Sequence, residues 1–234
     1  MSGLRQEFLK QYAKYLVTIG ILILLFMLLT QLLASELNPN LLQQFDFAII
    51  AWVQSWITPL LTDSFNVITY LGSVQALIIL VIITSLMLFI FKKTWEGILY
   101  IFTVAAGGGL NWLLKWIIHR ERPDINPLVV ESGYSFPSGH AMMAIIAYGM
   151  LGYYFVLFLQ SKAAKSITVI AFTILIFLIG LSRIYLGVHY PSDVIAGYAV
   201  GGAWLGASII ALEVLLRRRE SSRHSAERSV IPPG

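Results

Sequence analysis

Six long apolar stretches dominate the sequence and limit the chain to a fold that a bilayer can hold. Crossing the hydrocarbon core takes about 20 apolar residues in a helix, because no water is there to satisfy exposed backbone groups. Only 12% of the 234 residues are charged, against about 25% in soluble domains. The sequence therefore predicts an all-α polytopic membrane protein with six transmembrane helices. They run approximately over residues 13–34, 73–91, 97–118, 140–159, 167–187 and 194–216.

Two segments near the N-terminus need separate interpretation. The stretch 13–34 is too long and too uniformly apolar for the central region of a signal peptide, so we predict an uncleaved span. Residues 41–57 are apolar but interrupted by glutamine and aspartate, and Trp52 and Trp56 would share one helical face. We predict a short interfacial helix here, between the first two spans. The alternative is a helix that merely packs over the bundle.

The six spans and their connections form one predicted domain, residues 1–216. The basic segment 217–234 follows the last span, where a basic flank is usual. Alternatively, this segment binds anionic lipid headgroups, at about 1 kcal/mol per basic residue. We predict a disordered cytoplasmic tail.

The basic residues predict the orientation, because short cytoplasmic loops are enriched in Lys and Arg. With six crossings, one side receives the segments before span one and after spans two, four and six. The segment 35–72 on the opposite side contains no Lys or Arg. We therefore predict a multi-pass protein of the plasma membrane with both termini in the cytoplasm. The basic residues that support this orientation are Arg5, Lys10, Lys14, Lys92, Lys93, Lys162, Lys165, Arg217, Arg218, Arg219, Arg223 and Arg228.

Three polar islands interrupt the apolar chain on the predicted extracytoplasmic side. They are residues 115–123, 137–140 and 182–193. The first two flank a single external loop and the third comes two crossings later, so all three reach the same membrane face. Lys115 lies deep in apolar sequence, where a charge is costly unless it is functional.

The first and third islands contain cations suited to a phosphoryl group. Lys115 and Arg122 are seven residues apart, and would share one helical face if the helix continued to Pro123. Arg183 presents a planar fork that matches the oxygens of a phosphate. We interpret Arg120 as an interfacial anchor whose side chain extends to water.

The second island is expected to open a helix. Ser138 and Gly139 would then present unpaired backbone N–H groups to phosphate oxygens. The alternative role of Ser138 is the N-cap of that helix, and both roles can be filled at once. His140 follows directly and can supply a proton.

His189 and Asp193 are four residues apart, so the carboxylate can hold one imidazole N–H and leave the other nitrogen free for attack. The alternative role of Asp193 is the N-cap of the last span. A His/Asp metal site is the competing interpretation, but the clustered cations would repel a divalent ion. We therefore expect no metal and no other cofactor.

These three spacings together resemble the signature of the type 2 phosphatidic acid phosphatase superfamily, whose members are membrane lipid phosphatases and relatives. Residues 133–136 and 185–188 also resemble bacterial members of the phosphatidylglycerophosphate phosphatase B and undecaprenyl pyrophosphate phosphatase type. The resemblance implies that His189 forms a phosphohistidine, Asp193 orients it and His140 protonates the leaving alcohol. It implies phosphate binding by Lys115, Arg122, Ser138, Gly139 and Arg183. We add Asn111 and Tyr185 as candidate supporting residues around the site.

The expected activity is metal-independent hydrolysis of a lipid phosphate or pyrophosphate at the outer membrane face. Phosphatidylglycerophosphate, undecaprenyl pyrophosphate and phosphatidic acid are candidate substrates that the sequence does not separate. A phosphotransferase that passes the phosphoryl group to a second lipid would share every motif. A noncatalytic lipid-binding or transport protein has no need for a nucleophile, an acid and an orienting carboxylate together. The expected partners are the substrate and membrane lipids, without nucleic acid, and the oligomeric state is not predicted.

Overall fold

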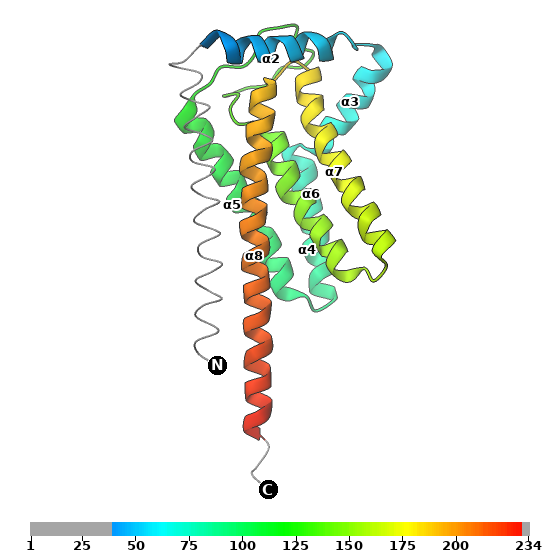
Figure 1. Ribbon diagram of the computed structural model, residues 1–234, viewed down its shortest axis with the longest axis vertical. Coiled ribbons are helices and arrows are strands. Elements are labelled where there is room, and N and C mark those ends of the chain that lie inside the picture. The colour runs from blue at the N-terminus through cyan, green and yellow to red at the C-terminus, as the bar shows by residue number, and fades with distance from the viewer. Residues whose placement is uncertain (1–38, 231–234) are drawn as a thin grey trace.

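The computed structural model describes the backbone of residues 39–230 and the side chains of residues 41–219. Every regular element in this part of the chain is a helix, as predicted, and the helices form an elongated bundle (Figure 1). In chain order the helices are α2 (Pro39–Gln54), α3 (Pro59–Leu71), α4 (Val74–Ile90), α5 (Thr94–Ile118), α6 (Gly139–Phe158), α7 (Lys162–Tyr185) and α8 (Pro191–Val230).

Helices α4 to α8 coincide with the five stretches predicted as spans between residues 73 and 216. Among the described helices, α5, α6, α7 and residues Pro191–Arg219 of α8 are long and apolar enough to cross a membrane. Helix α4 is apolar but has 17 residues, somewhat fewer than the roughly 20 of a typical span. The first predicted span, 13–34, lies outside the described residues, so the count of six stays a prediction.

The segment predicted as one interfacial helix is followed by a second helix. Helix α2 lies across the top of the bundle in Figure 1, and α3 turns down from it through 119°. Thr58 caps α3 by accepting the N–H of Leu61 at 3.3 Å, and Pro59 begins the helix. The apolar stretches of the sequence do not predict α3, because 13 residues are too few to cross a bilayer.

Helix α6 is the central helix of the bundle, with α5, α7 and α8 packed around it. Gly197 on α8 faces its first turn, where an added Cβ would lie 2.8 Å from the carbonyl oxygen of Ser138. This close approach allows the backbone N–H of Ser138 to donate to the carbonyl of Asp193 at 3.0 Å. The starts of α6 and α8 are therefore held side by side.

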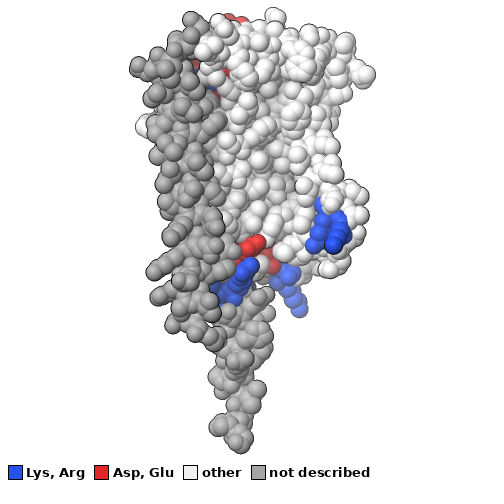
Figure 2. Space-filling view, in the orientation of Figure 1, with Lys and Arg blue, Asp and Glu red and all other residues white. Residues whose placement is uncertain are grey.

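Charged side chains gather near the lower end of the described surface in Figure 2, below a wide band without charge. The connections from α4 to α5 and from α6 to α7 lie toward this end (Figure 1). The opposite end receives the last residues of α5 and α7 and the first residues of α6 and α8. The connection before α5 contains Lys92 and Lys93, the start of α7 contains Lys162 and Lys165, and the later part of α8 contains Arg217, Arg218 and Arg219.

Helix α8 continues through the basic segment and ends at Val230. The disordered cytoplasmic tail expected from residue 217 stays a prediction, although the backbone of residues 217–230 is helical. Arg, Glu and Ala favour helix, and the first proline after Pro191 is Pro232.

Candidate active site

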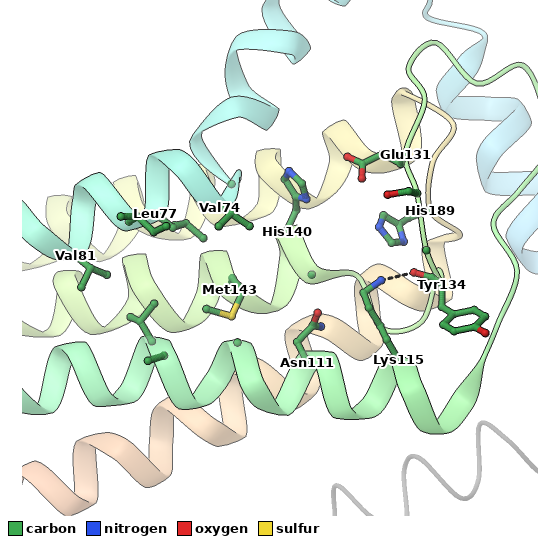
Figure 3. Close-up of a pocket in the computed structure, with 18 of the residues that line it drawn as sticks. Val74, Leu77, Val81, Asn111, Lys115, Glu131, Tyr134, His140, Met143 and His189 are labelled. Carbon is green, nitrogen blue, oxygen red and sulfur yellow. Dashed lines mark hydrogen bonds between the residues drawn. The ribbon is translucent and has the colours of Figure 1, made fainter.

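The three polar islands meet at the upper end of the bundle, around one end of a cavity of about 560 Å³. Figure 3 shows His140 and His189 at this end, with the loop that follows α5 closing over them. The polar side chains that line it are Asn111, Lys115, Arg122, Glu131, Ser132, Tyr134, His140 and His189.

His189 lies in the short connection between α7 and α8, with each ring nitrogen facing a different partner. Its Nδ1 is 3.5 Å from Oδ2 of Asp193 and 3.3 Å from the hydroxyl of Ser135, while its Nε2 is 3.2 Å from Nη1 of Arg122. Burial lowers the pKa of His189 to about 4, although the hydrogen bond to Asp193 acts to raise it. The imidazole is therefore neutral near pH 7, the form that can attack phosphorus.

Asp193 is fully buried in the first turn of α8. Its Oδ2 accepts the backbone N–H of Tyr190 at 2.9 Å and the hydroxyl of Ser135. A carboxylate that reaches back from the first turn to the residue before the helix satisfies an otherwise unpaired N–H. Asp193 is therefore not the N-cap residue of α8, as the alternative had it, but a first-turn residue that accepts the N–H of Tyr190 while it faces His189.

Lys115 and Arg122 reach the cavity from different elements. Helix α5 ends at Ile118, and His119 takes a left-handed conformation with φ of 51° while its N–H bonds to the carbonyl of Lys115 at 3.1 Å. The condition under which Lys115 and Arg122 would share one helical face, a helix that continues to Pro123, is therefore not met. The left-handed residue turns the chain out of the helix.

Arg122 instead points into the site because three backbone carbonyls hold its guanidinium. It donates to Gly133 and Val188, each at 2.9 Å, and to Ser132 at 3.0 Å. Burial lowers the pKa of Arg122, but a guanidinium stays charged throughout the physiological range. Lys115 donates to the carbonyl of Tyr134, so both cations are tied to the same loop (Figure 3).

Arg183 is buried on α7, with 2% of its surface exposed, and lies behind Glu131 rather than on the cavity wall. Its guanidinium donates to Thr69 at 2.6 Å and forms an ion pair with Glu131. The other carboxylate oxygen of Glu131 lies 3.8 Å from Arg122. Glu131 thus pairs with Arg122 and Arg183, two of the cations predicted to bind phosphate. Glu131 was not among the predicted site residues; the segment between the first two islands, 124–136, contains two acidic residues, Asp124 and Glu131.

The start of α6 differs in part from the prediction. The buried hydroxyl of Ser138 accepts the N–H of Ala141 at 3.5 Å, and the backbone N–H of Ser138 already donates to Asp193. Ser138 therefore caps α6 and fixes α8 rather than lining the cavity. Gly139 and His140 do line it.

Arg120 is not the anchor extending to water that the sequence predicted. Its guanidinium pairs with Asp46 at 2.7 Å and with Asp193 at 2.6 Å. Asp46 lies on α2 and is fully buried. Asp46 is the one charged residue in the sequence of α2 and was the available signal, but its partner is distant in sequence.

The two candidate supporting residues have different positions. Asn111 lines the cavity beside Gly139. Tyr185 does not line it: its hydroxyl lies 2.9 Å from that of Thr62 on α3, and its ring packs against Phe65. Tyr185 therefore joins α7 to α3. Among the described residues, no group of three or more His, Cys, Asp or Glu side chains could hold a metal ion.

The rest of the cavity is apolar and extends from the histidines along α4 and α5 (Figure 3). Its shape and lining suit an amphiphile whose charged group lies at the polar end and whose chain lies between the helices. The apolar lining residues are Val74, Leu77, Ile78, Val81, Ile82, Ile101, Val104, Ala105 and Met143.

Comparisons with known proteins agree with this combination of a helical membrane fold and a phosphate-type site. Residues 96–215 match the model of the PAP2 superfamily. The chain is 39% identical over 176 residues to "Phosphatidylglycerophosphatase B" of Bacillus subtilis (strain 168), covering 73% of this chain and 84% of the relative. Fold and site define a membrane lipid phosphatase. The chain belongs to the PAP2 superfamily.

Two further comparisons concern structure and substrate class. A crystal structure of a transmembrane PAP2 type phosphatidylglycerolphosphate phosphatase from Bacillus subtilis matches with a TM-score of 0.75 and 33% identity, covering 85% of this chain and 96% of that one. "Undecaprenyl-diphosphatase" of Sulfolobus acidocaldarius is 33% identical over 138 residues, covering 56% of this chain and 62% of the relative. The fold is therefore that of a multi-pass membrane phosphatase.

Because Glu131 holds two cations of the site, we expect Glu131→Gln to tighten the binding of inorganic phosphate. Removing the competing carboxylate should lower the inhibition constant of phosphate roughly tenfold, or ~1.4 kcal/mol. The measurement is phosphate inhibition of lipid phosphate hydrolysis by the purified protein. Glu121→Gln is the matched control, because Glu121 is an exposed carboxylate of the same loop. An unchanged or higher constant in Glu131→Gln would contradict the competition.

Proposed function

We propose that this protein hydrolyses a lipid phosphate or pyrophosphate without a metal ion, through a phosphohistidine formed on His189. The observation that carries the proposal is the division of one cavity into two ends. The polar end has a neutral imidazole beside Lys115 and Arg122, and the apolar end extends between α4 and α5. A phosphate and an acyl or prenyl chain on one molecule would occupy both ends together.

The first step is an in-line displacement at phosphorus. Nε2 of His189 forms the bond to phosphorus while the bond from phosphorus to the lipid oxygen breaks, and His140 gives that oxygen a proton. Asp193 favours the imidazole tautomer that leaves Nε2 free, and stabilises the positive charge that develops on the ring. Lys115 and Arg122 balance the charge on the phosphoryl oxygens at the cavity wall, and Arg183, which is paired with Glu131, adds its charge from behind that wall.

The second step returns the enzyme to its starting state. His140, now neutral, takes a proton from water as the water oxygen attacks phosphorus, and the bond between phosphorus and Nε2 breaks. Inorganic phosphate leaves, and His140 holds the proton that the next substrate requires. Protein cations supply the charge that metal ions provide in many phosphoryl-transfer enzymes.

We propose phosphatidylglycerophosphate, undecaprenyl pyrophosphate or phosphatidic acid as the substrate. The names of the similar proteins support the first two, and all three join a phosphate to a long apolar chain. A phosphotransferase would use the same site but deliver the phosphoryl group to a second lipid. Product analysis with an acceptor lipid separates the two activities.

We also propose that six helices span the plasma membrane, that α2 lies at its outer surface and that both termini are cytoplasmic. The site would then face the extracytoplasmic side. The basic residues outside the site support this orientation, because they gather toward one end of the bundle and the site lies at the opposite end. The two rings of Trp52 and Trp56, 4.4 Å apart at the end of α2, suit an interfacial position.

The proposed function is tested first by phosphate release from a panel of the three lipids in detergent, with and without EDTA. We expect activity to persist in EDTA, because the cations of the proposed site are side chains. Complete loss of activity that an added divalent metal restores would overturn the mechanism. Absence of activity on every lipid would overturn the proposed function.

The orientation predicts which loops an impermeant thiol reagent can reach. The chain contains no cysteine, so each cysteine introduced is the only reactive thiol. Cysteines placed in the loop 124–132 should react when the reagent is applied to intact cells, whereas cysteines in 161–164 should react only after permeabilisation. The opposite pattern would reverse the orientation and place the site at the cytoplasmic face.

A substrate whose leaving group needs no proton distinguishes the roles of the two histidines. An aryl phosphate with a very good leaving group should partly restore the activity of His140→Ala but not of His189→Ala, because only the second variant lacks the attacking nitrogen. His140→Ala should also accumulate phosphoenzyme, seen as a burst of alcohol followed by slow turnover. Equal restoration in both variants, or a phosphoenzyme in His189→Ala, would show that the roles are assigned wrongly.

A further inference from the structure

Helix α2 contributes one charged side chain to the interior of the protein, although it lies across the end of the bundle and outside the cavity. Asp46 is fully buried, and three donors satisfy its carboxylate. Its Oδ1 accepts the N–H of Ser192 at 2.9 Å, and its Oδ2 accepts the hydroxyl of Ser192 and Nη2 of Arg120, each at 2.7 Å. A buried carboxylate costs several kcal/mol unless it is paired in this way, so the contacts fix α2 to the start of α8.

Arg120 connects the carboxylate of Asp46 to that of Asp193, which faces His189. Its Nη1 donates to Oδ1 of Asp193 at 2.6 Å and to the hydroxyl of Ser192 at 2.8 Å, while Nη2 reaches Asp46. The guanidinium lies over the ring of Tyr190, 4.1 Å from its centroid. A rigid fork held on two carboxylates and one aromatic face has little freedom to move.

The consequence for Asp193 is a fixed rotation of its carboxylate. Arg120 holds Oδ1, while Oδ2 accepts from Tyr190 and Ser135 and faces His189. Rotation about the bond to the carboxylate would break contacts at both oxygens. Arg120 therefore determines that Oδ2 of Asp193 faces the imidazole, although Arg120 itself bonds to the other oxygen, Oδ1.

Electrostatics explains why Arg120 needs a second carboxylate. Alone, its positive charge would offset that of Asp193 and weaken the stabilisation of an imidazolium at His189. Asp46 pairs with the same guanidinium, so the three groups together keep one negative charge beside His189. Arg120 can then orient Asp193 without neutralising it.

We propose that Asp46 and Arg120 are a positioning pair for the catalytic carboxylate Asp193, with the acidic partner supplied by α2. This inference rests on the proposed function, because Asp193 acts there through His189. Neither residue of the pair lines the cavity. Removing either should therefore slow the chemical steps and leave substrate binding nearly unchanged.

The test compares Asp46→Asn, Arg120→Gln and the double variant, using whichever of the three proposed lipids the unsubstituted protein hydrolyses fastest. Each single variant should lower kcat roughly 10- to 100-fold, because small misplacements of reacting groups carry costs of this size. KM should change by less than about twofold. Arg120→Lys should recover part of the activity, because an ammonium keeps the charge but not the fork.

The double variant distinguishes a coupled pair from two separate residues. Each single substitution changes the net charge of the three groups from −1, to 0 in Asp46→Asn and to −2 in Arg120→Gln, and the double variant restores −1. Its loss in kcat should therefore be smaller than the product of the two single losses. Gln54→Ala is the matched control: it removes another contact of α2, with the carbonyl of Ile125, and leaves the pair intact. Its kcat should match that of the unsubstituted protein.

Several outcomes would overturn the pairing. One is a raised KM at normal kcat, which would assign Arg120 to substrate binding. Another is a loss of kcat in the double variant that equals the product of the two single losses. Reduced thermal stability with normal kcat per folded molecule would show that the pair only stabilises the fold. If Arg120→Gln does not fold, Asp46→Asn, which is nearly isosteric, decides by its kcat. No phosphate release from the unsubstituted protein would overturn the proposed function as well.

Discussion

The balance of buried charge at one end of an apolar bundle is the constraint on which the rest of this structure depends. A charged side chain in or beside a membrane is costly unless a partner compensates it. Here Arg120 is placed between two aspartates, and Arg183 is paired with Glu131. These pairs connect elements that are distant in the sequence, so the cost of burying charge also determines which helices must meet.

Close packing of two helices sets the geometry within this constraint. Gly197 brings α8 against the first turn of α6, and the resulting bond from Ser138 to the carbonyl of Asp193 fixes both helix starts. His140 belongs to one of these starts, and Asp193, which faces His189, belongs to the other. The proposed acid and nucleophile are thus positioned by backbone contacts, which vary less than contacts between long side chains.

The sequence predicted the helical class, the positions of helices α4 to α8 and the convergence of the three islands, because long apolar runs and their parity are local properties. The predicted span 97–118 ends where α5 ends, but the sequence did not predict the left-handed conformation of His119, which comes before the next proline, Pro123. It assigned Arg120 to water and overlooked Glu131, because the partners of both are distant in sequence. Ser138 illustrates the same limit: a helix start was predicted correctly, but the acceptor of its N–H lies on another helix.

The two ends of the cavity also bear on what happens after the reaction. The polar end is lined by the loop residues Ser132, Gly133 and Tyr134, and the apolar end lies between α4 and α5. Hydrolysis would turn one amphiphile into two products that prefer different solvents: an inorganic anion for water and a lipid alcohol for the bilayer. Each product would have its own route out, so the slower exit of one need not block the other. Recombination would then require both to return at once, which favours a reaction that runs in one direction.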